Sequence, residues 1–545
     1  MKSMKKKKKP KPERSASSVP AAFDPHALDA SKAAAARAAF KSAKPYTHVH
    51  LYGLFEQESL LAVRRELGTL HRTFKETDLF KLYQSGDLAN LSADIPEHAA
   101  ALPAMIQLRA ALYSEPFRAF VRSVTGCAPL TAQQDCSCNM YRKGGHLLCH
   151  DDVIGTRCVS YIVYLSRPGK SWKPRLGGAL ELYELGPDGA TVEPSPVSAL
   201  PPEFGSMVMF TVQPGVSYHA VQEVQANEPR LSVSGWFHAA TPPAGADSAA
   251  SLAQLQHQGR HDQGARPRAV RPPRPRPGLS SAQEQRLALL VSPVYLRAGT
   301  IAAVRAQLEA QGAALLTDFL RPEIAHVLRR ATAAADTKDG LGGGTLPPHL
   351  AGQRRKGWRA VGPPQLRRYL RHTPPKRAAA AEEGGKAGGK VGVGARLQAV
   401  RALMHSAPFV QLLSALSGHS ASRCASEVRR FRPGLDYTLA HVGTLRAQSS
   451  LEATLSFVAD EPHAAAQWDS GDVGGFECYV PSSDEGAAEV YRADEDSEGV
   501  TSVHPIANAL SLVVRRPNVM KFVKYVSAAA AGSRWDVAAE YLGEP

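Results

Sequence analysis

The chain has 545 residues, of which 43% are hydrophobic and 21% charged, and its formal net charge is +15. A chain of this length is too long to fold around one ordinary hydrophobic core, so two domains with linkers are expected, and the composition is that of globular proteins. No segment approaches the roughly 20 apolar residues of a membrane-spanning helix, and no apolar segment follows the basic N-terminus as in a secretory signal.

Residues 1–45 are rich in Lys, Pro, Ser and Ala and are expected to form a disordered basic tail, in which Ala33–Phe40 could form a short helix. Lysines cluster at Lys5–Lys9, and a second basic block lies at Arg266–Arg276. Such blocks serve as nuclear-import signals or nucleic-acid patches, but a solvated tail has the same composition. Sequence-specific nucleic-acid binding is not expected, because no aromatic residues are interleaved with the charges.

Residues 46–240 begin with predicted helices and end with predicted strands. Apolar residues recur at helical spacing from Leu60 to Leu70, and two more helices are predicted further along. From Asp135 to Phe237, short β-rich segments alternate with Gly and Pro turns. The helices are predicted at 102–113 and 116–124, and the strands at 159–165, 179–183, 206–212, 218–224 and 231–237. This order predicts an α+β domain with helices packed on a jelly-roll core.

Residues 241–286 are rich in Pro, Ala, Gln and Arg and are predicted to be a linker. A second globular region, 287–545, contains a low-complexity insertion near 378–394. Its predicted helices are 301–311 and 322–334, and its predicted strands are 437–441, 474–479, 511–515 and 521–526. Helices precede strands in both regions, so we expect a duplicated architecture.

The chain has seven cysteines, and Cys136 and Cys138 are separated by one residue. This spacing is typical neither of a zinc ribbon nor of a redox pair. Free thiols in a reducing compartment are therefore expected, which favours an intracellular protein.

His150, Asp152 and His219 form the most informative pattern in the chain. Side chains two residues apart on a strand share one face, so His150 and Asp152 can meet one metal ion. The pair alone is a weak signal, because a surface pair after a turn has the same spacing, and a lone strand histidine such as His219 is commonly an ordinary core residue. Together the three match the two-histidine, one-carboxylate triad of non-haem Fe(II), which leaves positions open for a co-substrate and O2.

Arg230 begins a predicted strand on which Ser232 shares its face. A guanidinium can bind the carboxylate of 2-oxoglutarate through two hydrogen bonds, and Ser232 can donate another. The alternative is an arginine that faces water at the end of a strand. Tyr164 could donate its hydroxyl to the same carboxylate and Tyr141 could line the pocket, although both also suit an ordinary core.

Several segments resemble the eukaryotic ribosomal prolyl 3-hydroxylases, which are 2-oxoglutarate- and iron-dependent oxygenase-domain proteins that modify a small-subunit ribosomal protein at the decoding centre. They are 78–88, 147–152, 160–165, 177–183, 217–219 and 230–238 in the first half, and 315–320, 436–441, 474–476 and 521–524 in the second. Many oxygenases share the iron triad, whereas the RLSVSGWFH segment at 230–238 and the two-half layout are more specific to this family.

The resemblance implies two double-stranded β-helix (jelly-roll) domains in tandem, each with packed helices. The first, 46–240, is expected to be catalytic and the second, 287–545, non-catalytic. The cofactors that it implies are Fe(II), 2-oxoglutarate, O2 and ascorbate. The residues that it implies are His150, Asp152 and His219 for the metal, and Arg230, Tyr164 and Tyr141 for 2-oxoglutarate, to which the shared strand face adds Ser232.

The implied reaction is C3 hydroxylation of a prolyl residue in a small-subunit ribosomal protein, with effects on translation accuracy and termination. Translation-termination factors are possible further partners, and the expected location is the nucleus and cytoplasm. Two alternatives remain: the same chemistry on another protein or a small molecule, or a non-enzymatic scaffold in termination or mRNA decay. An intact ligand set argues against the scaffold, because buried His and Asp without a metal are unfavourable.

The second region lacks a comparable metal-binding pattern. His441 is followed by Val442 and Gly443, so no carboxylate stands two residues on. At the distal position, we expect Lys524 and Tyr525 where the first region has His219, and neither is a good Fe(II) ligand at neutral pH. One iron per chain is therefore expected, with a second region that docks or stabilises.

Overall fold

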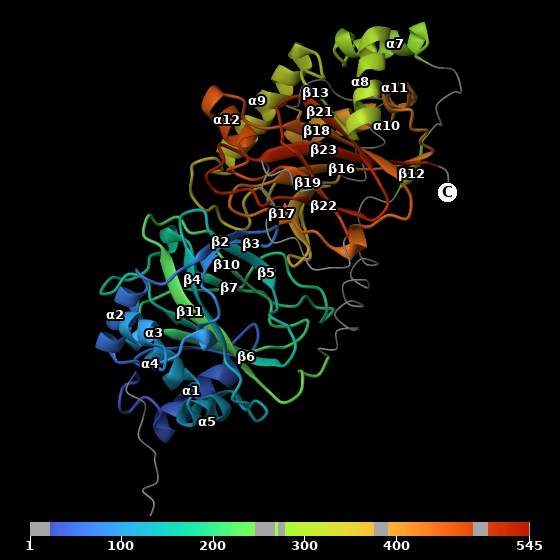
Figure 1. Cartoon of the computed structure of the whole chain (residues 1–545). Coiled ribbons are helices and arrows are strands. Elements are labelled where there is room, and N and C mark those ends of the chain that lie inside the picture. The colour runs from blue at the N-terminus through green and yellow to red at the C-terminus, as the bar shows by residue number, and fades with distance from the viewer. Residues whose placement is uncertain (1–21, 246–266, 271–277, 375–390, 483–499, 544–545) are drawn as a thin grey trace, which may run out of the picture.

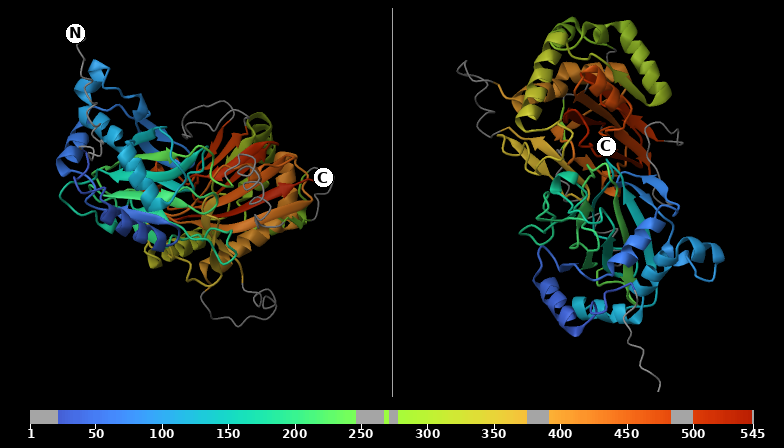
Figure 2. Two further views of the ribbon diagram at one scale, coloured as in Figure 1. Left: turned by 90° about the horizontal axis from the view of Figure 1, so that it is seen from below. Right: turned by 90° about the vertical axis from the view of Figure 1, so that its left-hand side faces the viewer.

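The computed structural model of the protein describes residues 22–245, 267–270, 278–374, 391–482 and 500–543. Two lobes lie side by side, one from each half of the chain, and the two further views show the same separation (Figure 1, Figure 2). We call residues 22–245 the N-terminal lobe and the described part of 267–543 the C-terminal lobe. Helices precede most strands in both lobes, as the sequence predicted.

Most helices of the N-terminal lobe cover one face of its sheet with apolar side chains. Helix α5 shows why such a helix forms: Ser114 accepts a hydrogen bond from the Phe117 amide at 3.4 Å, Pro116 lies in the first turn, and Gly126 ends the helix with φ 71°. Its buried face includes Phe117 and Val121. The helices are α1 (Ala30–Ser42), α2 (Gln57–Glu66), α3 (Pro96–Ala101), α4 (Pro103–Leu112) and α5 (Glu115–Thr125).

Eleven strands form the antiparallel sheet of the N-terminal lobe. They are β1 (His48–Leu51), β2 (Thr73–Glu76), β3 (Phe80–Gln84), β4 (Asp135–Tyr141), β5 (His146–His150), β6 (Arg157–Tyr164), β7 (Leu180–Leu182), β8 (Ser198–Leu200), β9 (Met207–Thr211), β10 (His219–Val221) and β11 (Arg230–His238). The order is β1-β9-β6-β11-β4-β3-β5-β10-β7-β8, with β2 beside β3.

This sheet folds over on itself, as a jelly-roll core requires. Alternate residues of β6 point to opposite faces, so Tyr161 and Val163 pack under the helices while Ile162 and Tyr164 point inward. The inward residues meet apolar side chains of β7 and β10, including Leu182. The lobe therefore has two apolar layers, one under the helices and one between the two parts of the sheet.

The C-terminal lobe also combines helices with antiparallel strands within the described residues. Its helices are α7 (Ser281–Ala288), α8 (Ala298–Gln311), α9 (Pro322–Lys338), α10 (Val393–His405), α11 (Ala407–Ser417) and α12 (Pro462–Asp469). Its strands are β12 (Arg268–Ala269), β13 (Ala313–Leu316), β14 (Trp358–Val361), β15 (Arg367–His372), β16 (Arg423–Phe431), β17 (Tyr437–Thr438), β18 (Ser450–Phe457), β19 (Glu477–Pro481), β20 (Thr501–Val503), β21 (Ala509–Arg515), β22 (Val519–Val523) and β23 (Arg534–Leu542).

Strand order is the feature that the two lobes share. The larger sheet of the C-terminal lobe runs β13-β21-β18-β23-β16-β15-β14, with β12 and β17 attached, and a second sheet runs β20-β19-β22. The five neighbouring strands β13-β21-β18-β23-β16 have the same topology as β1-β9-β6-β11-β4: in both sets, the strand that comes first in the chain lies beside the fourth, followed by the third, the fifth and the second. One pair of residues also occupies equivalent positions in the two lobes. Arg230 at the start of β11 pairs with Tyr141, and Arg534 at the start of β23 pairs with Phe431.

Part of the predicted tail is ordered, which corrects the boundary at residue 45. Helix α1 buries Ala33, Ala36 and Phe40, and Phe23 stacks on Phe55 and Phe117. The Ala- and Lys-rich composition suggested disorder, but the few apolar residues recur on one helical face and reach the core. Residues 1–21, which include the lysine block, lie outside the described residues.

The predicted linker is also partly ordered. Strand β12 pairs with β16, and α7 begins at Ser281 behind a capping box formed by Ser280 and Gln283. Most of the predicted insertion at 378–394 and most of the Arg266–Arg276 block lie outside the described residues, and α10 begins at Val393. In the described part of the chain, no helix combines the length and apolar character needed to cross a membrane. All seven cysteines carry free thiols.

Candidate metal centre and co-substrate pocket

Two neighbouring strands bring together the three side chains of the predicted metal site. Strand β5 ends at His150, β10 begins at His219, and these two residues pair directly. Asp152 follows β5 by two residues, and its carboxylate oxygens lie 3.2 Å from His150 Nε2 and 3.5 Å from His219 Nε2. One ligand atom from each residue lies within 4.8 Å of the others. Such a group can hold one metal ion from one side and leave the opposite side open.

Backbone carbonyl groups orient both imidazole rings toward this centre. His150 Nδ1 lies 2.8 Å from the Leu148 carbonyl oxygen, and His219 Nδ1 lies 2.8 Å from that of Ser217. A carbonyl oxygen can only accept, so Nδ1 carries a proton in each ring, and Nε2 is the nitrogen that faces the centre. Both rings therefore present to a metal ion the nitrogen that would bind it after losing its own proton.

Two further side chains hold the carboxylate of Asp152. Ser160 Oγ donates to Asp152 Oδ2 at 3.0 Å, and Trp236 Nε1 donates to the same oxygen at 3.1 Å. Arg157 stacks on the Trp236 ring at 3.4 Å. Asp152 has φ 63°, a left-handed conformation that is uncommon outside glycine and here turns the carboxylate back toward β10.

Ser160 and Trp236 were not among the predicted site residues. A signal for Trp236 was present, because it follows Arg230 by six residues on a strand and therefore shares its face. No comparable signal marks Ser160, whose contact depends on how β6 and β11 pair.

The electrostatics of the centre favour an ionised carboxylate. Burial would raise the pKa of Asp152, but the nearby His219 and the hydrogen bond from His150 outweigh it and hold that pKa well below its usual range. Burial would lower the pKa of His150, whereas Asp152 raises it, and the net shift is upward. A divalent cation among these atoms would replace the histidine protons as the partner of Asp152.

A buried cationic pocket lies on the adjoining strand. Arg230 is 1% exposed, its Nε donates to the Gly178 carbonyl at 2.8 Å, and one terminal nitrogen lies 3.4 Å from Ser232 Oγ. Among the described residues, its Nη2 has no hydrogen-bond partner, and the buried Tyr164 hydroxyl has none. The Tyr141 and Tyr164 rings lie 4.9 and 5.1 Å from the guanidinium carbon.

These unpaired donors fit an anionic ligand. A buried guanidinium with an unpaired nitrogen is unfavourable, and a carboxylate would satisfy that nitrogen through a charge-assisted hydrogen bond. Burial raises the pKa of Tyr164 and raises that of Tyr141 to about 12, so both hydroxyls keep their protons at neutral pH. The far carboxylate of 2-oxoglutarate matches this donor set. Tyr141, Tyr164 and Phe210 belong to one buried cluster, and Phe210 also packs on the His219 ring at 4.7 Å, so the pocket and the centre share one interior.

The C-terminal lobe has a different side chain where His219 stands in the N-terminal lobe. His219 pairs with Leu182, five residues after Gly177, and Lys521 pairs with Tyr479, five residues after Gly474. Lys521 is therefore the counterpart, which corrects the prediction of Lys524 and Tyr525. The prediction was wrong because the number of residues between the strands differs in the two lobes, and only strand pairing shows the register.

Lys521 is engaged in ion pairs. Its Nζ lies 3.2 Å from Glu452 and 3.3 Å from Glu477. Lys521 and Glu452 line a cavity of about 200 Å³, and His441 lines it as well. In the described part of the chain, His150, Asp152 and His219 form the one group of three or more His, Cys, Asp or Glu residues that could hold a metal ion.

Comparisons with known proteins give one family match in each lobe. Residues 136–238 match the 2OG-Fe(II) oxygenase superfamily, and residues 282–544 match the family described as oxoglutarate and iron-dependent oxygenase degradation C-term. The chain is 40% identical to the prolyl 3,4-dihydroxylase OGFOD1 of Ostreococcus tauri over 506 residues, which cover 91% of this chain and 95% of that protein.

More distant relatives cover similar lengths. The chain is 26% identical to the prolyl 3-hydroxylase OGFOD1 of Mus musculus over 539 residues, covering 89% of this chain and 85% of that protein. Among solved structures, it is similar to a prolyl-4-hydroxylase from Pseudomonas putida, with 18% identity, a TM-score of 0.28, and coverage of 37% of this chain and 98% of that one.

Proposed function

The chain belongs to the OGFOD1 family of prolyl hydroxylases, which are Fe(II)- and 2-oxoglutarate-dependent oxygenases, and we propose that its substrate is a prolyl residue of a small-subunit ribosomal protein. The observation that carries the assignment to this chain is the convergence of His150, Asp152 and His219 within 4.8 Å, beside a buried arginine with an unpaired nitrogen. Hydroxylation at C3 is supported by the names of the animal relatives.

We assign the metal to His150, Asp152 and His219, and the far carboxylate of 2-oxoglutarate to Arg230, with Tyr164, Tyr141 and Ser232 around it. When Fe(II), 2-oxoglutarate and O2 are bound, the centre supplies the oxidant for an unactivated C–H bond. The protein residues orient it: the Leu148 and Ser217 carbonyls fix the rings, and Ser160 and Trp236 fix the carboxylate. Ascorbate remains a prediction as a further cofactor.

We further propose that the two lobes are tandem double-stranded β-helices, of which only the N-terminal one is catalytic. The shared strand order supports this. Fe(II) ligands in the C-terminal lobe are disfavoured by Lys521 at the counterpart of His219, because a lysine ammonium is a poor ligand.

The test uses the full-length chain with Fe(II), 2-oxoglutarate and purified small-subunit ribosomal proteins. We expect one of these proteins to gain the mass of one oxygen atom, with the modified residue mapped to a proline by fragmentation. Omission of 2-oxoglutarate and the Asp152→Ala variant are the controls. Succinate formation that depends on another protein or a small molecule, with no ribosomal mass gain, would favour the alternative substrate.

For location, we propose the nucleus and cytoplasm, with Lys5–Lys9 as the import signal. Deletion of residues 1–14 should leave activity on a protein substrate unchanged and shift a fluorescent fusion out of the nucleus. The deleted block precedes α1 in the chain, and none of the residues assigned to the site lies within it. Lost activity with an unaltered location would assign the block a different role.

A further inference from the structure

We infer that the C-terminal lobe positions the two metal-bearing strands, and that Glu223 and Glu181 are the positioning residues through which it acts. This inference rests on the proposed metal site. It assigns the C-terminal lobe a part in the reaction that differs from substrate docking, because the contacts lie on the strands that carry His150 and His219.

The metal-bearing strands end at the junction between the lobes. Strand β10 lies between β5 and β7. Glu223 follows β10 by two residues, and Glu181 in the centre of β7 pairs with Ala220, the neighbour of His219. His146 begins β5, the strand that ends at His150. All three strands therefore connect the metal centre with the junction.

Glu223 is bound by one short segment of the C-terminal lobe. Its carboxylate accepts hydrogen bonds from the Ser527 hydroxyl at 2.7 Å, the Ala528 amide at 2.7 Å and the Tyr525 hydroxyl at 3.2 Å. Glu223 is 3% exposed, so these donors replace the water that the carboxylate would otherwise need. The end of β10 is thus held at a defined position against the C-terminal lobe.

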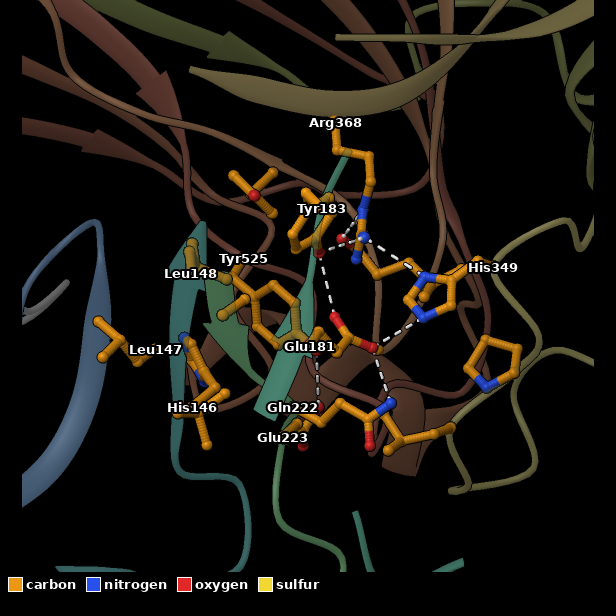
Figure 3. Close-up of a pocket in the computed structure, with 17 residues that line it drawn as sticks. His146, Leu147, Leu148, Glu181, Tyr183, Gln222, Glu223, His349, Arg368 and Tyr525 are labelled. Carbon is orange, nitrogen blue, oxygen red and sulfur yellow. Dashed lines mark hydrogen bonds and ion pairs between the residues drawn. The ribbon is translucent and has the colours of Figure 1, made fainter. Parts of the chain in front are cut away.

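Glu181 joins a second set of contacts (Figure 3). Its carboxylate accepts from Gln222 at 2.7 Å and from Tyr183 at 3.0 Å within its own lobe, and it pairs with His349 of the C-terminal lobe at 2.8 Å. Arg368 of the same lobe donates to the Tyr183 hydroxyl at 3.3 Å. Burial would raise the pKa of Glu181, but His349 and Arg368 outweigh it and lower that pKa, so the carboxylate stays charged.

The junction is closely packed around these two carboxylates. His146 packs on the Tyr525 ring at 4.3 Å, and Leu148 joins one apolar cluster with Tyr437 and Tyr525. The cavity that Glu181 and His146 line measures about 30 Å³, room for about one or two water molecules. A displacement of the C-terminal lobe would therefore be transmitted to β5 and β10, because little free space can absorb it.

The effect on the metal follows from ligand geometry. Groups hydrogen-bonded to metal ligands typically change metal affinity by about 10- to 100-fold when they are removed, because they orient the ligands. Glu223 and Glu181 would act on the same orientation through the strands, so we expect the lower end of this range. Glu223 stands four residues from His219, so a shift of the β10 end would change the angle at which His219 meets the metal. If the junction only held the two lobes together, substitutions in it would change the stability of the protein but not its metal affinity.

Asp78 provides a matched control at the same junction. Its carboxylate accepts a hydrogen bond from the Ala440 amide of the C-terminal lobe at 2.9 Å. It lies in the turn between β2 and β3, which carries no metal ligand. Asp78→Ala and Glu223→Ala thus each remove one carboxylate from the junction, but only Glu223 continues a metal-bearing strand.

The experiment measures Mn2+ affinity, melting temperature and amide hydrogen exchange of the full-length chain. We expect Glu223→Ala to weaken Mn2+ binding by about tenfold and to speed exchange of β10 amides, whereas Asp78→Ala lowers the melting temperature with little change in affinity. The milder Tyr525→Phe and Ser527→Ala variants each remove one donor to Glu223, and they carry the test if Glu223→Ala does not fold.

The outcomes separate this inference from the proposed function. If the unchanged chain binds no Mn2+, or if His219→Ala binds it equally well, the proposed metal site is wrong. If the unchanged chain binds Mn2+ through His219, and the Glu223, Tyr525 and Ser527 variants show the same affinity as Asp78→Ala, the C-terminal lobe is adhesive and the positioning role is wrong.

Discussion

The two lobes arrange their strands in the same order but fill their interiors differently. In the N-terminal lobe, Trp236 pairs with Ser160, and both side chains donate to Asp152. At the same register in the C-terminal lobe, Glu540 pairs with Glu452. Two neutral donors that hold a metal-site carboxylate are thus replaced by two carboxylates.

Cations balance those carboxylates in the C-terminal lobe. Lys521, at the position of His219, and Arg515 both pair with Glu452, and Arg446 pairs with Glu540. The comparison shows that one backbone arrangement can hold either a metal site or an ion-pair network. A few side chains at paired positions decide between them, because each buried charge must find a partner of opposite sign.

The largest expected effect comes from giving the N-terminal lobe the side chain of the C-terminal lobe. His219→Lys should abolish both Mn2+ binding and 2-oxoglutarate turnover, because an ammonium next to Asp152 forms an ion pair in place of the metal. The reverse change, Lys521→His, should create no second site, since no carboxylate follows His441 by two residues as Asp152 follows His150. Metal analysis should give one equivalent for Lys521→His and none for His219→Lys; retention of metal by His219→Lys would contradict the assigned triad.

The second effect concerns stability of the C-terminal lobe. Lys521→Ala removes one buried partner of Glu452 and Glu477, which keep Arg515 and Arg534. The cost should therefore lie near the lower end of the about 3–5 kcal/mol that an uncompensated buried charge typically causes. We expect urea unfolding to show a loss of this order. Metal stoichiometry should stay at one, because the N-terminal lobe keeps its ligands.

Arg230 and Arg534 begin equivalent strands, and the third prediction separates their roles. Arg230→Gln should raise the Michaelis constant for 2-oxoglutarate by an amount equivalent to about 1.5–3 kcal/mol, the usual contribution of a hydrogen bond to a charged group. Mn2+ affinity should be largely unchanged. Arg534 pairs with Glu477 at 3.0 Å and Asp536 at 3.0 Å, so Arg534→Gln should lower stability and leave the Michaelis constant as it was. Steady-state kinetics of both variants provide the check, and equal Michaelis constants would refute the pocket.

The smallest effect is a pH dependence on the N-terminal side of the junction. Burial lowers the pKa of His146 to about 3, helped by the nearby Lys524, so the folded state holds this ring neutral. The unfolded chain takes up the proton near pH 6.5. Stability from this group is therefore complete above about pH 6.5 and falls by at most about 1.4 kcal/mol per pH unit down to about pH 3.

The ion pairs of the C-terminal lobe titrate in a lower range. Burial would raise the pKa of Glu477, but Lys521 and Arg534 outweigh it and hold that pKa far below the unfolded value, so its contribution persists until the pH falls below about 4.5.

The contribution of His146 can be measured above that range. Urea unfolding at pH 7.5 and pH 5 should show a smaller pH effect for His146→Asn than for the unchanged chain. An identical slope would mean that His146 is protonated in the folded protein.

The sequence predicted best those elements whose signal lies among residues close together in the chain. The β-rich composition of β6 and the helical spacing of apolar residues in α2 predicted both elements, because each signal lies within one short stretch of the chain. The strands β16, β18 and β23 were missed in part or in full. Their charged residues, such as Glu452 and Arg429, disrupt the apolar pattern and are satisfied only by partners from other strands.

By itself, the sequence determined which residues could form a metal site and a carboxylate pocket, since His150 and Asp152 share a strand end and Arg230 opens a strand with Ser232 on its face. Only the tertiary structure decided the contacts that depend on register and on the junction. Lys521 rather than Lys524 is the counterpart of His219 because strand pairing sets the alignment. Glu223 meets its donors some three hundred residues further along the chain. Contacts of this kind leave no periodic pattern in the sequence. They form because burial removes water, so that each buried polar group must be paired with a group that the fold brings near.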